Sequence, residues 1–126
     1  MLGPILLLAV TLCGCQSAAL TAAKLYLRQG DLPHAEEQLR LASRQDPGNA
    51  EVHFLLGRIA AKQGRYAAMD SSFRTAWNLG GAYRRPIASV RQRHWAQAYN
   101  RGVACLGTEP PQPAAAARAF GQAIAI

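Results

Sequence analysis

The chain has 126 residues, which is enough for one domain or for a short array of repeats. Half of its residues are hydrophobic but only 7% are aromatic, so we expect a shallow core in which small residues let helices approach closely. The formal net charge of +7 favours acidic partners, and three cysteines are too few for a disulfide framework.

The N-terminus combines an apolar run with two closely spaced cysteines. Residues 2–12 have the length of a signal-peptide hydrophobic region and are too few to span a bilayer as a mature helix. Residues 12–15, Leu-Cys-Gly-Cys, resemble the lipobox of bacterial lipoproteins. That resemblance implies a signal peptide over residues 1–14, lipidation of Cys15, and, with Gln16 next, a place on the periplasmic side of a Gram-negative outer membrane. The alternative is a buried N-terminal helix with incidental cysteines.

Two helical hairpins are predicted between residues 17 and 79. Apolar residues at helical spacing predict a helix over 17–29, and Gly30 ends it. A second helix is predicted to begin at the capping residue Asp31 and to end before residues 46–49. The next hairpin is predicted over 50–63 and 66–79, with a turn at Gly64 and a stop at Gly80.

These two hairpins repeat each other. Three pairs of similar residues lie 34 positions apart, namely Gly30 and Gly64, Leu39 and Phe73, and Ala42 and Ala76. This period, together with the adjacent Leu56 and Gly57, resembles tetratricopeptide (TPR) repeats. The resemblance implies an all-α fold, a TPR-type α-solenoid of antiparallel helix pairs over residues 15–126. Its units would be about 18–47 and 50–79, followed by a divergent unit at 86–126.

The last part of the chain departs from the 34-residue register. A long helix is predicted from Arg84 to Leu106, with Gly102 at the glycine position of the repeat, and a paired helix over 114–126. Solenoids normally end in a polar capping repeat. Because none is visible, the pattern predicts a truncated or uncapped array; the alternative is that a partner or a second copy covers the same face.

No motif of an enzyme is found. A glycine-rich phosphate loop, the HExxH pattern and paired metal-binding cysteines are all missing from the sequence, and His34, His53 and His94 are far apart. We therefore expect no catalytic activity, no metal and no cofactor. Residues 84–101 combine arginines with aromatics, as nucleic-acid patches do, but an exported lipoprotein is not expected to bind nucleic acid.

The TPR resemblance also implies a concave groove lined by the first helix of each unit. Six residues are predicted to line it: Lys24, Arg28, Phe54, Arg58, Lys62 and Tyr99. Basic and aromatic side chains together suit an acidic, partly hydrophobic peptide. The alternative is that the lysines and arginines only keep an alanine-rich surface soluble.

The sequence thus predicts a membrane-anchored scaffold for protein–protein interactions in the bacterial envelope. Pilus biogenesis, secretion or envelope assembly would all suit such a protein, and no motif selects among them or identifies the partner. Two alternatives remain open. One is the N-terminal interaction module of a larger envelope enzyme or export component, and the other is a basic protein that binds membrane surfaces.

Overall fold

The computed structural model describes residues 17–126, which fold into helices only. The predicted signal peptide and Cys15 lie outside the described residues. The elements are α1 (Ala18–Gln29), α2 (Leu32–Gln45), α3 (Ala50–Lys62), α4 (Tyr66–Leu79), the short 3-10 helix η1 (Gly81–Tyr83), α5 (Arg84–Leu106) and α6 (Pro113–Ala125). In this part of the chain no helix is long and apolar enough to cross a membrane.

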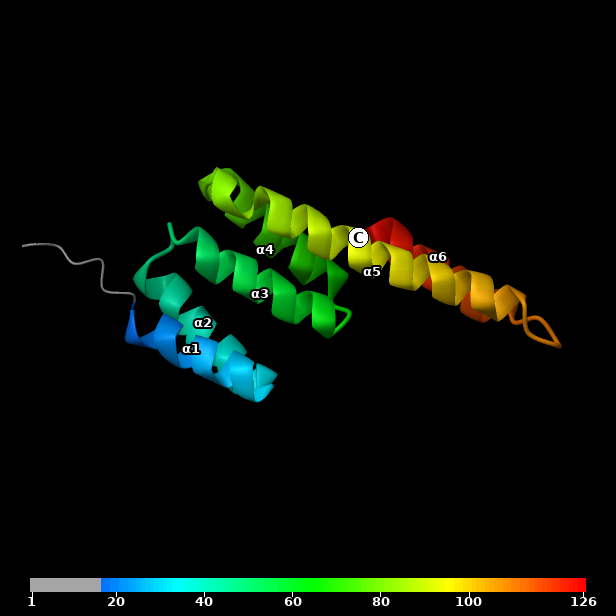
Figure 1. Cartoon of the computed structure of the whole chain (residues 1–126), viewed down its shortest axis with the longest axis horizontal. Coiled ribbons are helices and arrows are strands. Elements are labelled where there is room, and N and C mark those ends of the chain that lie inside the picture. The colour runs from blue at the N-terminus through cyan, green and yellow to red at the C-terminus, as the bar shows by residue number, and fades with distance from the viewer. Residues whose placement is uncertain (1–16) are drawn as a thin grey trace, which may run out of the picture.

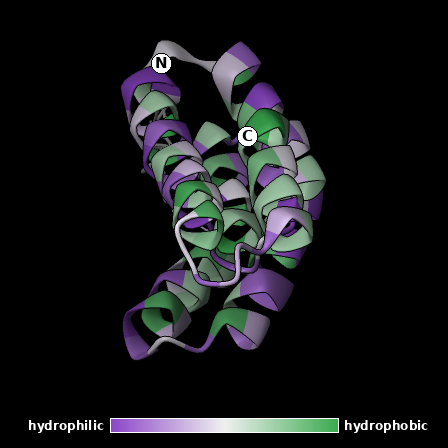
Figure 2. Ribbon diagram, turned by 90° about the vertical axis from the view of Figure 1, so that its right-hand side faces the viewer, coloured by the Kyte–Doolittle hydropathy of each residue, from purple (hydrophilic) through white to green (hydrophobic). Residues whose placement is uncertain are grey.

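The helices form three antiparallel pairs that stack one on the next, α1 with α2, α3 with α4, and α5 with α6. Figure 1 shows that α1, α3 and α5 run in the same direction, so each hairpin repeats the path of the one before it. Hydrophobic and hydrophilic segments are interspersed along the ribbons in Figure 2, as expected where helices bury one side. The predicted all-α solenoid of helix pairs is therefore confirmed.

Local sequence signals fix where the first helices begin and end. The side chain of Asp31 accepts a hydrogen bond from the His34 amide at 3.2 Å, and Asn49 accepts from the amides of Glu51 and Val52. Gly30 has a φ of 77° and Gly64 a φ of 69°, a left-handed conformation that favours glycine. These two glycines turn the chain within each of the first two pairs.

One hydrophobic cluster joins the first four helices to the start of α5. Leu20, Leu39, Ile59 and Phe73 are 0–1% exposed within it, and Ile87 brings the first half of α5 into the same cluster. The buried residues of the second half of α5 and of α6 are all small, and the larger Phe120 ring between the two helices is only half-buried: Ala98, Gly102, Ala116, Ala119 and Ala123 are the buried ones. The third pair therefore buries much less apolar volume than the first two.

Each pair closes on a small residue that faces a larger one. A Cβ atom placed on Gly57 would lie 2.3 Å from the ring of Phe73, and one placed on Gly102 would lie 2.5 Å from the ring of Phe120. Both glycines are thus required for close helix approach. In the first pair the corresponding positions hold Ala23 and Leu39, which are both fully buried. Alanine is larger than Gly57 and leucine is smaller than Phe73, so the two differences in size offset each other.

The third pair is displaced outward along α5. This helix has 23 residues, which corresponds to a length of about 34 Å, and α6 lies beside its second half only. In Figure 1 the α5–α6 hairpin consequently extends past the ends of α3 and α4. The extra turns at the start of α5 account for the loss of the 34-residue register after Gly81.

Candidate interaction surface

Four basic side chains recur on α1 and α3 with the period of the fold. Lys24 and Arg28 lie one helical turn apart on α1, and Arg58 and Lys62 occupy the positions 34 residues later on α3. Because residues i and i+4 share a face of a helix, each pair projects from one side of its helix. We call these four residues the basic face.

An ion pair connects the two helices at this face. The Lys24 ammonium lies 2.8 Å from the Glu51 carboxylate, and the two side chains are 31% and 27% exposed. Arg28, Arg58 and Lys62 are exposed, and within residues 17–126 no ion pair engages them. Three cations of the basic face are therefore available to an acidic ligand.

An aromatic stack supports the basic face from beneath. Phe54 is only 8% exposed and lies between Phe73 and Tyr83, with ring centroids 5.9 Å and 4.9 Å away. Burial, followed by the charge of Glu51, raises the pKa of Tyr83. The Arg58 guanidinium lies 5.8 Å from the Phe54 ring centroid, a distance at which a cation–π interaction holds the arginine over the stack. Phe54 thus orients Arg58 and offers little apolar surface itself.

Tyr99 belongs to a different part of the molecule. It lies on the second half of α5, is 45% exposed, and makes ring contacts with Trp95 and Phe120. The structure therefore brings five of the six predicted groove residues together on α1 and α3 and places Tyr99 in the third pair.

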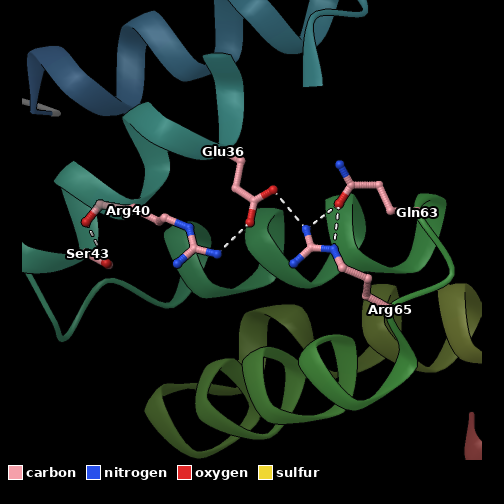
Figure 3. Close-up of polar contacts among 5 residues, drawn as sticks. All are labelled: Glu36, Arg40, Ser43, Gln63 and Arg65. Atoms are coloured by element: carbon pink, nitrogen blue, oxygen red, sulfur yellow. Dashed lines mark hydrogen bonds and ion pairs between the residues drawn. The ribbon is translucent and has the colours of Figure 1, made fainter. Parts of the chain in front are cut away.

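A second charged cluster bridges α2 and the start of α4 (Figure 3). The Glu36 carboxylate accepts hydrogen bonds from Arg40 and Arg65, each at 2.8 Å, and Arg65 also donates to Gln63. Burial raises the pKa of Glu36, but the two arginines outweigh it and hold the pKa below its ordinary value. Glu36, Arg40 and Arg65 line part of a cavity of about 210 Å³, yet both arginines are already paired with the Glu36 carboxylate. We interpret the cluster as a connection between units.

The same arrangement recurs 34 residues later. Asp70 accepts hydrogen bonds from Arg74 on its own helix and from Arg91 on α5, as Glu36 does from Arg40 and Arg65. Arg91 also donates to the main-chain oxygen of Ile126 at 2.6 Å, so it joins α4, α5 and the end of α6. The hydrogen bond from Arg91 is the main cause of a pKa lowered below the ordinary value for Asp70.

The residues that could carry chemistry are dispersed. In the described part of the chain no group of three or more His, Cys, Asp or Glu side chains lies close enough to hold a metal ion. His94 is half-buried against the edge of Tyr66, and burial, then the charges of Arg93 and Arg101, lower the pKa of His94. Cys105 is half-buried as a free thiol.

Comparison with known proteins supports the repeat architecture. Residues 20–68, which run from α1 into the start of α4, match the family model of the tetratricopeptide repeat. This segment of the chain is similar to a TPR repeat. No curated protein and no solved structure matches it. TPR repeats generally mediate protein–protein interactions, and proteins of this kind are typically non-catalytic scaffolds.

The sequence pattern did not reveal two features of this surface. One is Tyr83, which covers Phe54 from a 3-10 helix that the sequence pattern does not signal. The other is an apolar row on α5 formed by Trp95, Tyr99, Val103 and Leu106, each between 45% and 50% exposed. The spacing of these four residues, i, i+4, i+8 and i+11, is a detectable signal for a single helix face.

Proposed function

We propose that this TPR protein is a non-enzymatic scaffold that binds an acidic peptide on the basic face. The observation that carries the proposal is the 34-residue recurrence of cations, Lys24 and Arg28 on α1 and Arg58 and Lys62 on α3, of which all but Lys24 are exposed and outside any ion pair of the described residues. Charged residues that only keep a protein soluble need not recur at the same position of each repeat. A peptide with carboxylates along one side would meet cations from both units.

We further propose that acylated Cys15 anchors this scaffold to the periplasmic leaflet of an outer membrane. The lipobox-like residues 12–15 support this location. Each buried CH₂ group of an acyl chain contributes about 0.8 kcal/mol, so two or more chains give stable anchoring. Helix α1 begins at Ala18, so the basic face would lie close to the membrane, in reach of other envelope proteins.

Reversing two charges of the basic face is expected to abolish most of the affinity for an acidic peptide. The probe is a fluorescein-labelled synthetic peptide of glutamates interspersed with leucines, and its anisotropy reports binding. The double variant Arg58→Glu/Lys62→Glu should weaken binding at least about tenfold, because two attractive contacts become repulsive.

The matched control makes the same change in net charge elsewhere. Arg44 on α2 and Arg118 on α6 are both exposed, so Arg44→Glu/Arg118→Glu removes the same total charge without touching the basic face. If the control weakens binding as much as the test variant does, the peptide responds to net charge alone and the proposed site is wrong.

Removing the thiol of Cys15 is expected to release the protein from membranes. In a Gram-negative host the Cys15→Ser variant should lose palmitate labelling and move from the membrane fraction, since acylation needs the thiol. A variant that stays membrane-bound without incorporating palmitate would rule out the lipid anchor. This result would leave the peptide-binding proposal untouched, because the basic face needs no membrane.

A further inference from the structure

The apolar row on α5 occupies a position that the preceding unit keeps covered. Gly57 and Gly102 each face the aromatic ring of the paired helix, so they mark equivalent places on α3 and α5. Tyr99 precedes Gly102 by three residues, as Phe54 precedes Gly57, so the two aromatic residues correspond. The ring centroid of Tyr99 lies 5.6 Å from that of Phe120, and the ring centroid of Phe54 lies 5.9 Å from that of Phe73. The two aromatic pairs are therefore the same structural element.

The outer sides of these two pairs differ. The other side of Phe54 is covered by Tyr83 of the next unit at 4.9 Å, which leaves Phe54 8% exposed. The other side of Tyr99 carries only Trp95 of the same helix, stacked at 5.2 Å with planes 10° apart. Trp95 and Tyr99 remain 48% and 45% exposed, and no described residue covers them as Tyr83 covers Phe54.

The shape of the apolar row fits another helix. Trp95, Tyr99, Val103 and Leu106 run along one side of α5 for about three turns. Neighbouring helices pack by placing the side-chain ridges of one helix into the grooves of the other. An amphipathic helix carries such a ridge of apolar side chains at positions i, i+3, i+4 and i+7. In the second unit the face is likewise covered by helical structure, η1 and the beginning of α5.

The charge around the apolar row restricts which helix fits. Helices α5 and α6 contain six arginines and no aspartate or glutamate. Arg84 precedes Trp95 by three turns and Arg85 precedes Tyr99 by four, so both exposed arginines start from the same side of α5. The Arg84 guanidinium also lies 5.3 Å from the ring centroid of Trp77 on α4. A second copy of this chain would bring arginines against arginines, which disfavours self-association through this face.

We propose that the apolar row, with Arg84 and Arg85, is a second docking site that takes an acidic amphipathic helix of a partner protein. The partner's apolar residues pack on Trp95, Tyr99, Val103 and Leu106, and its carboxylates face Arg84 and Arg85. This site is separate from the basic face and goes beyond the function proposed above, so either proposal can fail alone.

Trp95 itself reports occupation of the site. The protein has two tryptophans, so Trp77→Phe leaves Trp95 as the only one. The probe is a synthetic peptide of about five helical turns with leucines on one side and glutamates on the other. We expect it to shift Trp95 emission to shorter wavelength as the ring leaves water, and to bind less tightly as salt rises. A peptide with lysine in place of every glutamate should bind at least about tenfold more weakly.

Variants assign the binding to these side chains. With a fluorescein-labelled peptide, Trp95→Ala and Val103→Ser should each weaken binding about tenfold, as truncations of central apolar contacts do. Val103 is 49% exposed, so its substitution tests the surface with little loss of buried contact in the third pair. Leu25→Ala on α1 removes an equally exposed side chain, 47%, and should leave affinity unchanged.

Several outcomes would overturn the proposal. An unshifted Trp95 emission with the acidic peptide, or an equal shift with the lysine peptide, would exclude an acidic helix as the occupant. A shift produced only by phosphatidylglycerol vesicles would make the row a membrane contact. Sedimentation that reveals a dimer broken by Val103→Ser would make it an interface between copies of this chain.

Discussion

Phe73→Ala is expected to lower the free energy of unfolding by about 3–5 kcal/mol, the usual cost of removing a fully buried phenylalanine ring. Phe73 is 0% exposed, fills the space left by Gly57, and touches the ring of Phe54. It also lies 5.9 Å below the Arg91 guanidinium, which links α4 to α5. One truncation therefore loosens the contact within the second pair and the contact between the second and third pairs. Urea unfolding followed by circular dichroism measures the effect.

Phe120→Ala is the matched control for this truncation. Phe120 fills the space above Gly102 as Phe73 does above Gly57, but it is half-buried, and the small residues around it offer fewer contacts. We expect a loss of no more than about half that of Phe73→Ala. Hydrogen exchange should quicken in α6 and the second half of α5 only. Equal losses for the two variants would contradict our assignment of the core to the first four helices and the start of α5.

Gly57→Ala is expected to destabilise the protein by about 1–2 kcal/mol, although alanine favours helices over glycine by about 1 kcal/mol. The added Cβ would lie 2.3 Å from the Phe73 ring, so the buried ring must shift. Gly121→Ala is the matched control, because a Cβ there meets nothing within 4 Å, and this substitution should stabilise α6 slightly. Urea midpoints of the two variants should move in opposite directions.

The first pair suggests how to rescue Gly57→Ala. Ala23 and Leu39 hold the positions of Gly57 and Phe73 and are both fully buried. The double variant Gly57→Ala/Phe73→Leu should therefore be more stable than the sum of the two single changes predicts, by about 1 kcal/mol. Simple additivity would mean that the small and large residues do not compensate each other.

Most of the helical architecture could be predicted from the sequence, because its signals are local. Gly30 and Gly64 end the first helix of their pairs in the left-handed conformation, and Asp31 and Asn49 begin the next helices by accepting amide hydrogen bonds. The predicted bounds of α3 and α4 agree with the structure to within one residue at each end. The requirement for glycine at Gly57 was also predictable, since the repeat period places a helix against it.

The candidate site was predictable only in part. The sequence identified Lys24, Arg28, Arg58 and Lys62, whose spacing is a property of single helices and of the repeat. It could not show that Glu51 neutralises Lys24, because that ion pair depends on the distance between α1 and α3. It also could not show that Tyr83 buries Phe54, since this contact joins residues of different units.

By itself the sequence determined the helices, their pairing and the period of the basic residues, because caps, turns and hydrophobic spacing act over a few residues. Only the tertiary structure decided which cations stay free, how exposed Tyr99 is, and that the third pair is displaced along α5. These properties depend on how far each pair slides along its neighbour. The burial of Ile87 in the core and the ion pair between Arg91 and Asp70 fix that displacement. No local sequence signal encodes the displacement. The exposed row from Trp95 to Leu106 is a consequence of the same displacement.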